Sequence, residues 1–251
     1  MVYFIGAGPG AADLITVRGC ELLKKADVVI YAGSLVNPEL LAYTKAGCKI
    51  FNSATMTLEE VFEVIVREYA RDKIIVRLHT GDPSIYGAIR EQMDLLDAHD
   101  MEYSVVPGVS SFCGAAAALN AEYTLPDVSQ TVILSRMEGR TSVPDDEEIS
   151  KLASHKASMV LFLTSSMVEQ LSKKLIEGGY QEETPAAIVY KATWPEQKII
   201  RTTVGNLHKS AEENNISKTA LILVGDFLSC NYKRSKLYDG SFTHEFRKAK
   251  D

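Results

Sequence analysis

The chain has 251 residues, of which 46% are hydrophobic and 24% charged, the balance of an ordinary soluble globular protein. Its 27 basic and 33 acidic residues give a net charge of −6, which argues against a nucleic-acid-binding protein, because such proteins usually carry a basic excess. No apolar run approaches the roughly 20 residues of a membrane span, and the start MVYFIGAGPG lacks a signal-like core, so a cytoplasmic location without a membrane partner is expected.

Short apolar runs alternate with helical patterns through the first half of the chain. Helix-start signals stand between the runs: Thr16 is placed as an N-cap, Asn37 precedes Pro38, and Thr57 is spaced for a capping box with Glu60. Helices are expected from Thr16 to 25, after Asn37, from Thr57 to about 71, and over 85–98. Strands are expected at 2–7, 27–31, 73–78 and 103–106. Because these strands are continuously apolar, they predict a buried parallel sheet covered by helices.

The second half predicts another α/β domain. Strands are expected at 131–134, 158–163, 186–190, 198–202 and 220–224, with a helix from about 167. The expected organisation is an N-terminal domain over 1–115, a C-terminal domain over 120–228, and a basic tail over 229–251 with six basic and three acidic residues. The fold class is therefore α/β, with two domains and a ligand cleft between them.

Cysteine and histidine spacing gives no metal signature. No cysteine pair has the C-x-x-C spacing, and no histidine stands at a ligand spacing from a cysteine. Neither a zinc site nor a disulfide framework is expected, and free thiols are expected at Cys20, Cys48, Cys113 and Cys230.

A glycine-rich turn, residues 6–11 (GAGPGA), follows the first strand and fits the loose dinucleotide fingerprint G-x-G-x-x-A. The chain runs on through 12–15 before Thr16 caps the next helix, and the second strand ends in Tyr31, Ala32 and Gly33 without an acid to hold a ribose. The motif has two interpretations. It is either a tight turn that needs glycine dihedrals or, as favoured here, a place where the backbone approaches a ligand without phosphates.

Two further loops each follow a strand. Residues 80–87 (TGDPSIYG) follow the third strand, and residues 107–111 (PGVSS) follow the fourth. The carboxyl ends of parallel strands lie at one edge of an open sheet, where ligands bind. Asp82, Ser110 and Ser111 are therefore expected either to cap helices or to present polar groups to a ligand.

In their amino-acid sequences and in their order along the chain, these three loops resemble those of the tetrapyrrole (precorrin) methyltransferase family, class III of the S-adenosylmethionine-dependent methyltransferases. The resemblance spans about residues 2–228. Three later segments, 131–141 (TVILSRMEGRT), 189–195 (VYKATWP) and 201–204 (RTTV), are similar to the C11-methyltransferases of (cobalt-)precorrin-4. The resemblance implies methylation of C11 in cobalamin biosynthesis by an enzyme that is commonly a homodimer.

The same resemblance implies a set of residues that bind S-adenosylmethionine and leave S-adenosylhomocysteine as product. These come from the three loops and from two segments of the second half: Pro9, Thr80, Gly81, Asp82, Ile85, Ser110, Ser111, Thr164 and Ala192.

The acceptor in this family is a macrocycle with acetate and propionate groups, so an acidic protein needs local positive charge to bind it. Arginine pairs bidentately with carboxylates. Arg136, Arg140, Arg201 and Lys191 are the substrate-binding candidates, with solvated surface charge as the alternative. The single tryptophan, Trp194, is expected to pack.

Methyl transfer is an in-line displacement that depends on alignment of donor and acceptor, so it needs no nucleophilic triad. Proton loss from the macrocycle would need a base, and Asp82 is the catalytic candidate, with Glu138 and Tyr86 as others.

Other functions remain open. Within the class, another precorrin methyltransferase, a uroporphyrinogen methyltransferase, a diphthine synthase or an rRNA methyltransferase is possible, although the uroporphyrinogen enzymes are expected to have GGD where this chain has Thr80-Gly81-Asp82. Outside it stand a nucleotide-dependent oxidoreductase and a tetrapyrrole carrier. Whether the substrate already carries cobalt is open, as is the role of the tail.

Overall fold

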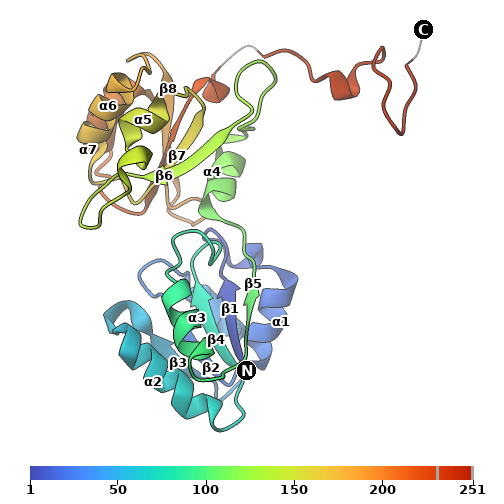
Figure 1. Cartoon of the computed structure of the whole chain (residues 1–251), viewed down its shortest axis with the longest axis vertical. Helices are drawn as coiled ribbons and strands as arrows, with labels where there is room; N and C mark the ends of the chain where they lie inside the picture. The colour runs from blue at the N-terminus through green and yellow to red at the C-terminus, as the bar shows by residue number, and fades with distance from the viewer. Residues whose placement is uncertain (230–231, 250–251) are drawn as a thin grey trace. The chain divides into compact units, whose positions relative to one another are not determined.

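The computed structural model describes residues 1–229 and 232–249 and contains two five-stranded sheets (Figure 1). The residues group into a first unit, Met1–Ala115 with Lys191–Gln197, and a second unit, Ala116–Tyr190 with the chain from Lys198 onward. Cys230, Lys250 and Asp251 fall outside the described residues. No described helix is long and apolar enough to cross a lipid bilayer.

The first unit is built on a fully parallel sheet in the order β3-β2-β4-β1-β5. Its elements are β1 (Val2–Gly6), α1 (Val17–Lys25), β2 (Val28–Tyr31), β3 (Lys49–Asn52), α2 (Leu58–Tyr69), β4 (Ile75–His79), α3 (Arg90–Asp97) and β5 (Tyr103–Val106), with short 3-10 helices at Ala12–Leu14, Pro38–Tyr43 and Ser53–Thr55. Helix α4 (Ser111–Leu119) begins in this unit and ends in the second. The four expected strands are confirmed, and β3 was not expected.

The three central strands of the first sheet, β2, β4 and β1, are buried along nearly their whole length. Since successive side chains of a strand point to opposite sides, both faces of the sheet are covered there. On β1, Phe4 packs in one apolar cluster with residues of α2, and Ile5 packs in another with Leu23 of α1. This double burial explains the unbroken apolar runs in the sequence.

Helices α1 and α2 begin at side-chain caps. The Thr16 hydroxyl accepts a hydrogen bond from the Gly19 amide at 3.2 Å, and Thr57 and Glu60 form the expected capping box. The expected helix over 85–98 was wrong at its start, because α3 begins only at Arg90. Tyr86 and Ala88 have φ values of 55° and 48°, left-handed conformations that a right-handed helix excludes.

The second unit has a mixed sheet in the order β6-β7-β10-β8-β9, in which β6 and β7 are parallel and the other neighbours antiparallel. The elements are β6 (Val132–Arg136), α5 (Ile149–Ala153), β7 (Ser158–Phe162), α6 (Val168–Glu177), β8 (Pro185–Tyr190), β9 (Lys198–Thr203), α7 (Leu207–Glu213) and β10 (Ala220–Val224), with 3-10 helices at Asp145–Glu147, Val204–Asn206, Asp226–Leu228 and Lys236–Tyr238. The five expected strands are confirmed. Helices α5, α6 and α7 cover one face over a single apolar core (Figure 1).

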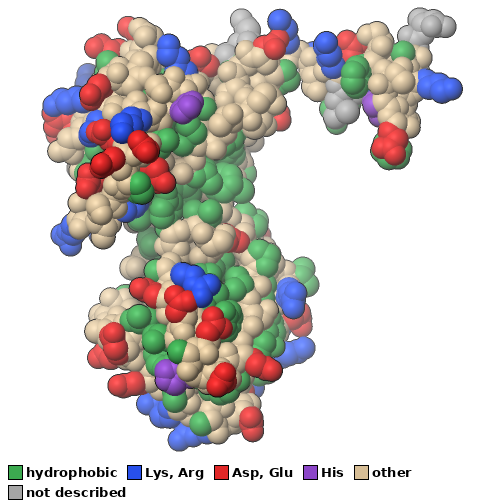
Figure 2. Space-filling view, viewed as in Figure 1, with side chains coloured by type: hydrophobic (Ala, Val, Ile, Leu, Met, Phe, Trp, Pro, Cys, Tyr) green, Lys and Arg blue, Asp and Glu red, His purple; other side chains and the backbone are tan. Residues whose placement is uncertain are grey.

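Segment 191–197 belongs to the first unit, although it lies inside the range expected for the second domain. The hydroxyl of Thr193 accepts a hydrogen bond from the Ala11 amide at 2.9 Å, and the Trp194 ring lies against Gly10. On the visible face of both units, side chains of both charge signs are interspersed (Figure 2).

Candidate active site

Three backbone loops meet at the carboxyl edge of the first sheet. The amide of Gly81 donates to the Gly8 carbonyl at 2.8 Å, which joins the loop after β4 to the loop after β1. A Cβ added to Gly108 would lie 2.2 Å from the Gly81 carbonyl oxygen, and one added to Gly6 would lie 2.5 Å from Gly108 Cα. The loops can approach this closely only because Gly6 and Gly108 lack side chains, and Gly81 adopts a φ of 60° that favours glycine; we call these three residues the glycine junction.

Asp82 connects two of these loops. Its Oδ2 accepts a hydrogen bond from the Gly108 amide at 2.8 Å, and its Oδ1 accepts from both the amide and the hydroxyl of Ser84. Burial raises the pKa of the Asp82 carboxyl, but hydrogen bonds from Ser84 and Gly108 outweigh it and hold the pKa below its ordinary value. With both oxygens engaged, this carboxylate is better suited to hold the loops together than to accept a proton.

Three of the expected cofactor residues lie around the glycine junction, and a fourth, Gly81, belongs to it. Ser110 is buried at the start of α4, and Ser110 and Ser111 are the nearest neighbours of a Cβ added to Gly81, at 3.4 to 3.5 Å. Pro9 is buried against Gly114 of α4. The structure therefore brings Pro9, Gly81, Ser110 and Ser111 together from three loops.

The loop after β8 completes this surface. Ala192 is buried, and its carbonyl oxygen lies 2.7 Å from the position of a Cβ on Gly10. Lys191 Nζ lies 5.1 Å from the centre of the Trp194 ring and 3.6 Å from a Glu196 carboxylate oxygen. The Lys191 charge thus has partners within its own loop, and Trp194 packs as expected.

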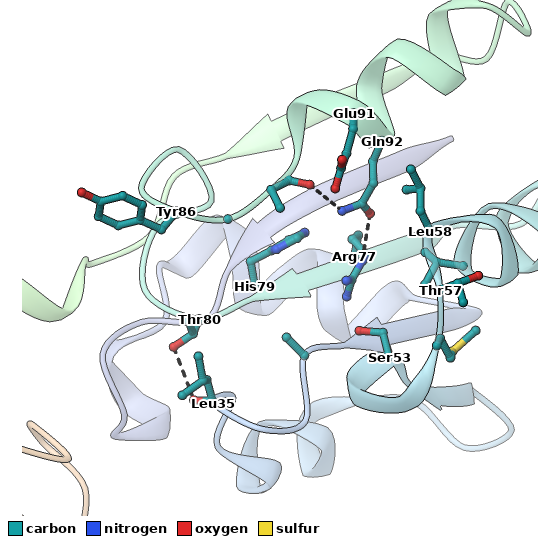
Figure 3. A pocket seen from close by; sticks show the side chains of 15 residues that line it. Leu35, Ser53, Thr57, Leu58, Arg77, His79, Thr80, Tyr86, Glu91 and Gln92 are labelled. Atoms are coloured by element: carbon teal, nitrogen blue, oxygen red, sulfur yellow. Dashed lines mark hydrogen bonds between the residues drawn. The ribbon is translucent and has the colours of Figure 1, made fainter. Parts of the chain in front are cut away.

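Thr80 and Ile85 lie on the long loop between β4 and α3. The Thr80 hydroxyl donates to the Leu35 carbonyl at 3.3 Å, which connects this loop to the one after β2. Ile85 is partly buried. Beside them, a pocket of about 250 Å³ extends under the loop and is lined by side chains of β4, α2 and α3 (Figure 3).

In the second unit, the side chain of Thr164 faces inward. It is fully buried, donates to the Phe162 carbonyl at 2.6 Å and accepts from the Met137 amide at 3.1 Å. Its neighbour Leu163 is 62% exposed and has a φ of 52°. The side chain presented at the end of β7 is therefore Leu163, which the sequence analysis did not single out.

Two of the three expected substrate arginines, Arg136 and Arg201, have partners inside the second unit. Arg136 donates to the carbonyls of Met137, Thr141 and Ser142 and so shapes its own loop. Arg201 donates to the Leu119 carbonyl at 3.0 Å and to the Leu228 carbonyl at 3.2 Å. Arg140 is exposed. Arg136 and Arg201 therefore each have a structural use in addition to any role with substrate.

Known proteins show clear similarity to this chain. The model of the family "Tetrapyrrole (Corrin/Porphyrin) Methylases" matches residues 1–208. The Cobalt-precorrin-4 C(11)-methyltransferase of Methanocaldococcus jannaschii is 51% identical over 249 residues, covering 99% of this chain and 96% of the relative. The Precorrin-4 C(11)-methyltransferase of Mycobacterium tuberculosis H37Rv is 43% identical, covering 94% and 95%.

Solved structures agree with the sequence relatives. An X-ray structure of cobalt precorrin-4 methyltransferase, described as a cobalamin biosynthetic enzyme, matches with a TM-score of 0.89 and 49% identity, covering 91% of this chain and 96% of that one. Uroporphyrin-III C-methyltransferase from Thermus thermophilus, in complex with S-adenyl homocysteine, matches with a TM-score of 0.74 at 24% identity, covering 91% and 93%, which supports the fold alone.

Proposed function

We propose that this chain, which belongs to the tetrapyrrole (corrin/porphyrin) methylase family, methylates C11 of precorrin-4 or cobalt-precorrin-4 in cobalamin biosynthesis. The observation that carries the proposal is the 51% identity to a cobalt-precorrin-4 C11-methyltransferase over 99% of the chain. A tetrapyrrole substrate, a homodimer and a cytoplasmic location belong to the same proposal.

S-adenosylmethionine is the proposed methyl donor, and the glycine junction suits it. The molecule has a sulfonium, an amino-acid moiety and a nucleoside but no phosphates, so it needs hydroxyl groups, small side chains and backbone groups to hold it. Ser110, Ser111 and Pro9 supply these around Gly81, where an added Cβ would meet nothing closer than 3.4 Å. We propose that these residues, with Ala192, hold the donor, which supplies an electrophilic methyl carbon when bound.

The protein's part in the reaction is alignment. A methyl group passes to a carbon nucleophile when the two reacting atoms are held in line, roughly 3–3.5 Å apart. Asp82 fixes the loop after β4 to the loop after β5 and so sets the position of the residues that orient the donor. We assign Asp82 this positioning role rather than the role of base for which it was a candidate, because both of its oxygens already accept hydrogen bonds.

A nucleotide-dependent oxidoreductase fits the same loops poorly. Helix α1 begins at Val17, well after the glycine turn, so its N-terminus does not stand behind the turn where a pyrophosphate would bind. Gly33, at the end of β2, donates its amide to Asn52 and offers no carboxylate for a ribose.

Calorimetric titration with S-adenosylhomocysteine, NAD and NADP distinguishes a methyltransferase from a nucleotide-dependent oxidoreductase. The proposal predicts micromolar binding of S-adenosylhomocysteine and no binding of either dinucleotide. Binding of a dinucleotide alone would overturn it. An assay with uroporphyrinogen III beside precorrin-4 as methyl acceptor then distinguishes the C11 enzyme from other members of the family.

A further inference from the structure

The pocket beside β4 contains two polar side chains, Arg77 and His79, that the mechanism above does not use. They stand at alternate positions of one strand, so they face the same side of the sheet, under Gln92 of α3 (Figure 3). The volume of about 250 Å³ falls below the range of roughly 300–1,000 Å³ typical of pockets that enclose a whole small ligand. The pocket therefore suits one side arm of a large ligand better than the ring itself.

Arg77 is a buried cation with neutral partners. Its residue is 7% exposed, its Nε donates to Gln92 Oε1 at 3.0 Å, and its Nη1 donates to the Ile30 carbonyl at 3.2 Å. Burial lowers the pKa of Arg77 to about 10, so the side chain stays charged at neutral pH. Among the residues that the structure describes, none forms an ion pair with Arg77; Glu91, which also lines the pocket, is exposed. A buried charge without a counter-ion is costly, and a bound carboxylate would offset that cost.

Gln92 holds this guanidinium in place. Its Nε2 donates to the Ala88 carbonyl at 3.0 Å, so its oxygen is turned toward Arg77. Among the described residues, two of the five N–H groups of Arg77 donate hydrogen bonds, one on Nε and one on Nη1. A carboxylate can accept two parallel hydrogen bonds from one guanidinium.

His79 supplies a second, independent sign of a missing ligand. The residue is 4% exposed, and its Nε2 is buried without a hydrogen-bond partner. Burial, aided by the charge of Arg77, lowers the pKa of His79 to about 3, so the ring is neutral at physiological pH. Buried polar atoms in native proteins nearly always have a partner, so this nitrogen is suited to a ligand atom or to a water molecule that accompanies it.

We propose that Arg77 anchors one carboxylate arm of the tetrapyrrole in this pocket, with Gln92 orienting the guanidinium and a water molecule that accompanies the arm donating to His79 Nε2. The identity of the ligand as a tetrapyrrole rests on the proposed function. The anchor acts in binding, so its loss raises KM for the macrocycle and leaves binding of S-adenosylhomocysteine intact.

The test compares Arg77→Gln and Arg77→Lys with Arg90→Gln, a matched control that removes an exposed arginine paired with Asp94 on α3. Uroporphyrin III, which has eight carboxylates, is the tetrapyrrole probe, and its binding is followed by fluorescence; S-adenosylhomocysteine binding is measured on the same samples. Loss of charge-assisted hydrogen bonds should raise the uroporphyrin Kd of Arg77→Gln at least tenfold, with a smaller rise for Arg77→Lys. The S-adenosylhomocysteine Kd should stay within twofold of wild type.

An unchanged uroporphyrin Kd in Arg77→Gln would overturn the proposed anchor. Equal weakening of uroporphyrin binding and S-adenosylhomocysteine binding would also overturn it, because Arg77 would then be a structural residue. If Arg77→Gln does not fold, Arg77→Lys decides by the same two readouts. A wild-type protein that binds S-adenosylhomocysteine but no tetrapyrrole would overturn the proposed substrate and the anchor with it.

Discussion

The Oδ2 atom of Asp82 accepts a hydrogen bond from the backbone amide of Gly108 at 2.8 Å, so that one carboxylate joins the loops after β4 and β5. The same side chain accepts from Ser84 within its own loop. This link places the residues of the glycine junction, and it makes the consequences of several substitutions predictable.

Replacing Asp82 with asparagine should loosen the junction. An amide has one accepting oxygen, so its NH₂ group would face either the Gly108 or the Ser84 amide, at a cost of about 1–3 kcal/mol. We expect the Kd for S-adenosylhomocysteine to rise about tenfold, measured by calorimetry. Asp94→Asn, which changes an exposed carboxylate of α3, is the control. Turnover lost at full cofactor occupancy, with unchanged affinity, would instead restore Asp82 as a base.

Gly108→Ala should destabilise the first unit, because the new Cβ would lie 2.2 Å from the Gly81 carbonyl oxygen. Two backbones must then move apart, which should lower the free energy of unfolding by roughly 1–3 kcal/mol or more. Urea unfolding measures the effect. Gly240→Ala, where nothing lies within 4 Å of the added Cβ, should behave as wild type. Equal stability of the two variants would contradict the close approach.

Gly10→Ala should displace the only tryptophan. The added Cβ would lie 2.2 Å from Trp194 Cδ1, so the ring must leave its place against the glycine turn. Because no other tryptophan contributes, the fluorescence emission should shift to the red, and S-adenosylhomocysteine affinity should fall with it. An unshifted spectrum would mean that segment 191–197 does not pack on this turn.

Substitutions at two neighbouring residues at the end of β7 should lower stability by different amounts. Thr164→Val removes a hydroxyl that bonds both Phe162 and Met137 and leaves the Met137 amide without an acceptor, which should cost about 1–3 kcal/mol of stability. Leu163→Ala changes an exposed side chain and should cost less than about 0.5 kcal/mol. Thermal unfolding of both variants checks this, and the reverse order would place Thr164 at the surface.

His79 should make stability depend on pH. Its folded pKa of about 3 lies below the ordinary value, so the unfolded chain binds the extra proton first, and stability falls as pH drops below about 6.5. Relative to His79→Gln, the wild type should lose about 1.4 kcal/mol more between pH 7.5 and 5.5, measured by urea unfolding. His99→Gln, at an exposed site, serves as control; identical losses in wild type and His79→Gln would show that this ring titrates normally.

Local signals were sufficient to predict much of the fold. The hydroxyls of Thr16 and Thr57 cap their helices as their spacing indicated, and the apolar runs became the buried strands. The start of α3 could not be predicted, because the left-handed conformations at Tyr86 and Ala88 have no signal in the local sequence.

Tertiary contacts decided the rest. Trp194 packs against Gly10, although the two residues are far apart in the sequence. No local sequence pattern near either residue predicts this contact. Arg77 stands inside an apolar run of the sequence. A single charged residue in a buried strand was the feature from which the pocket could have been predicted. The direction of the Thr164 side chain is set by its bond to Met137, and the ligand cleft expected between the domains stays a prediction.

The most direct measurement of the central claim is transfer of a ¹³C-labelled methyl group from S-adenosylmethionine to precorrin-4 and to cobalt-precorrin-4, each made enzymatically, with the product examined by NMR. The proposed function predicts one new labelled methyl group, attached to C11 of the macrocycle. A label at another ring carbon, or no transfer from a protein that binds S-adenosylhomocysteine, would contradict it.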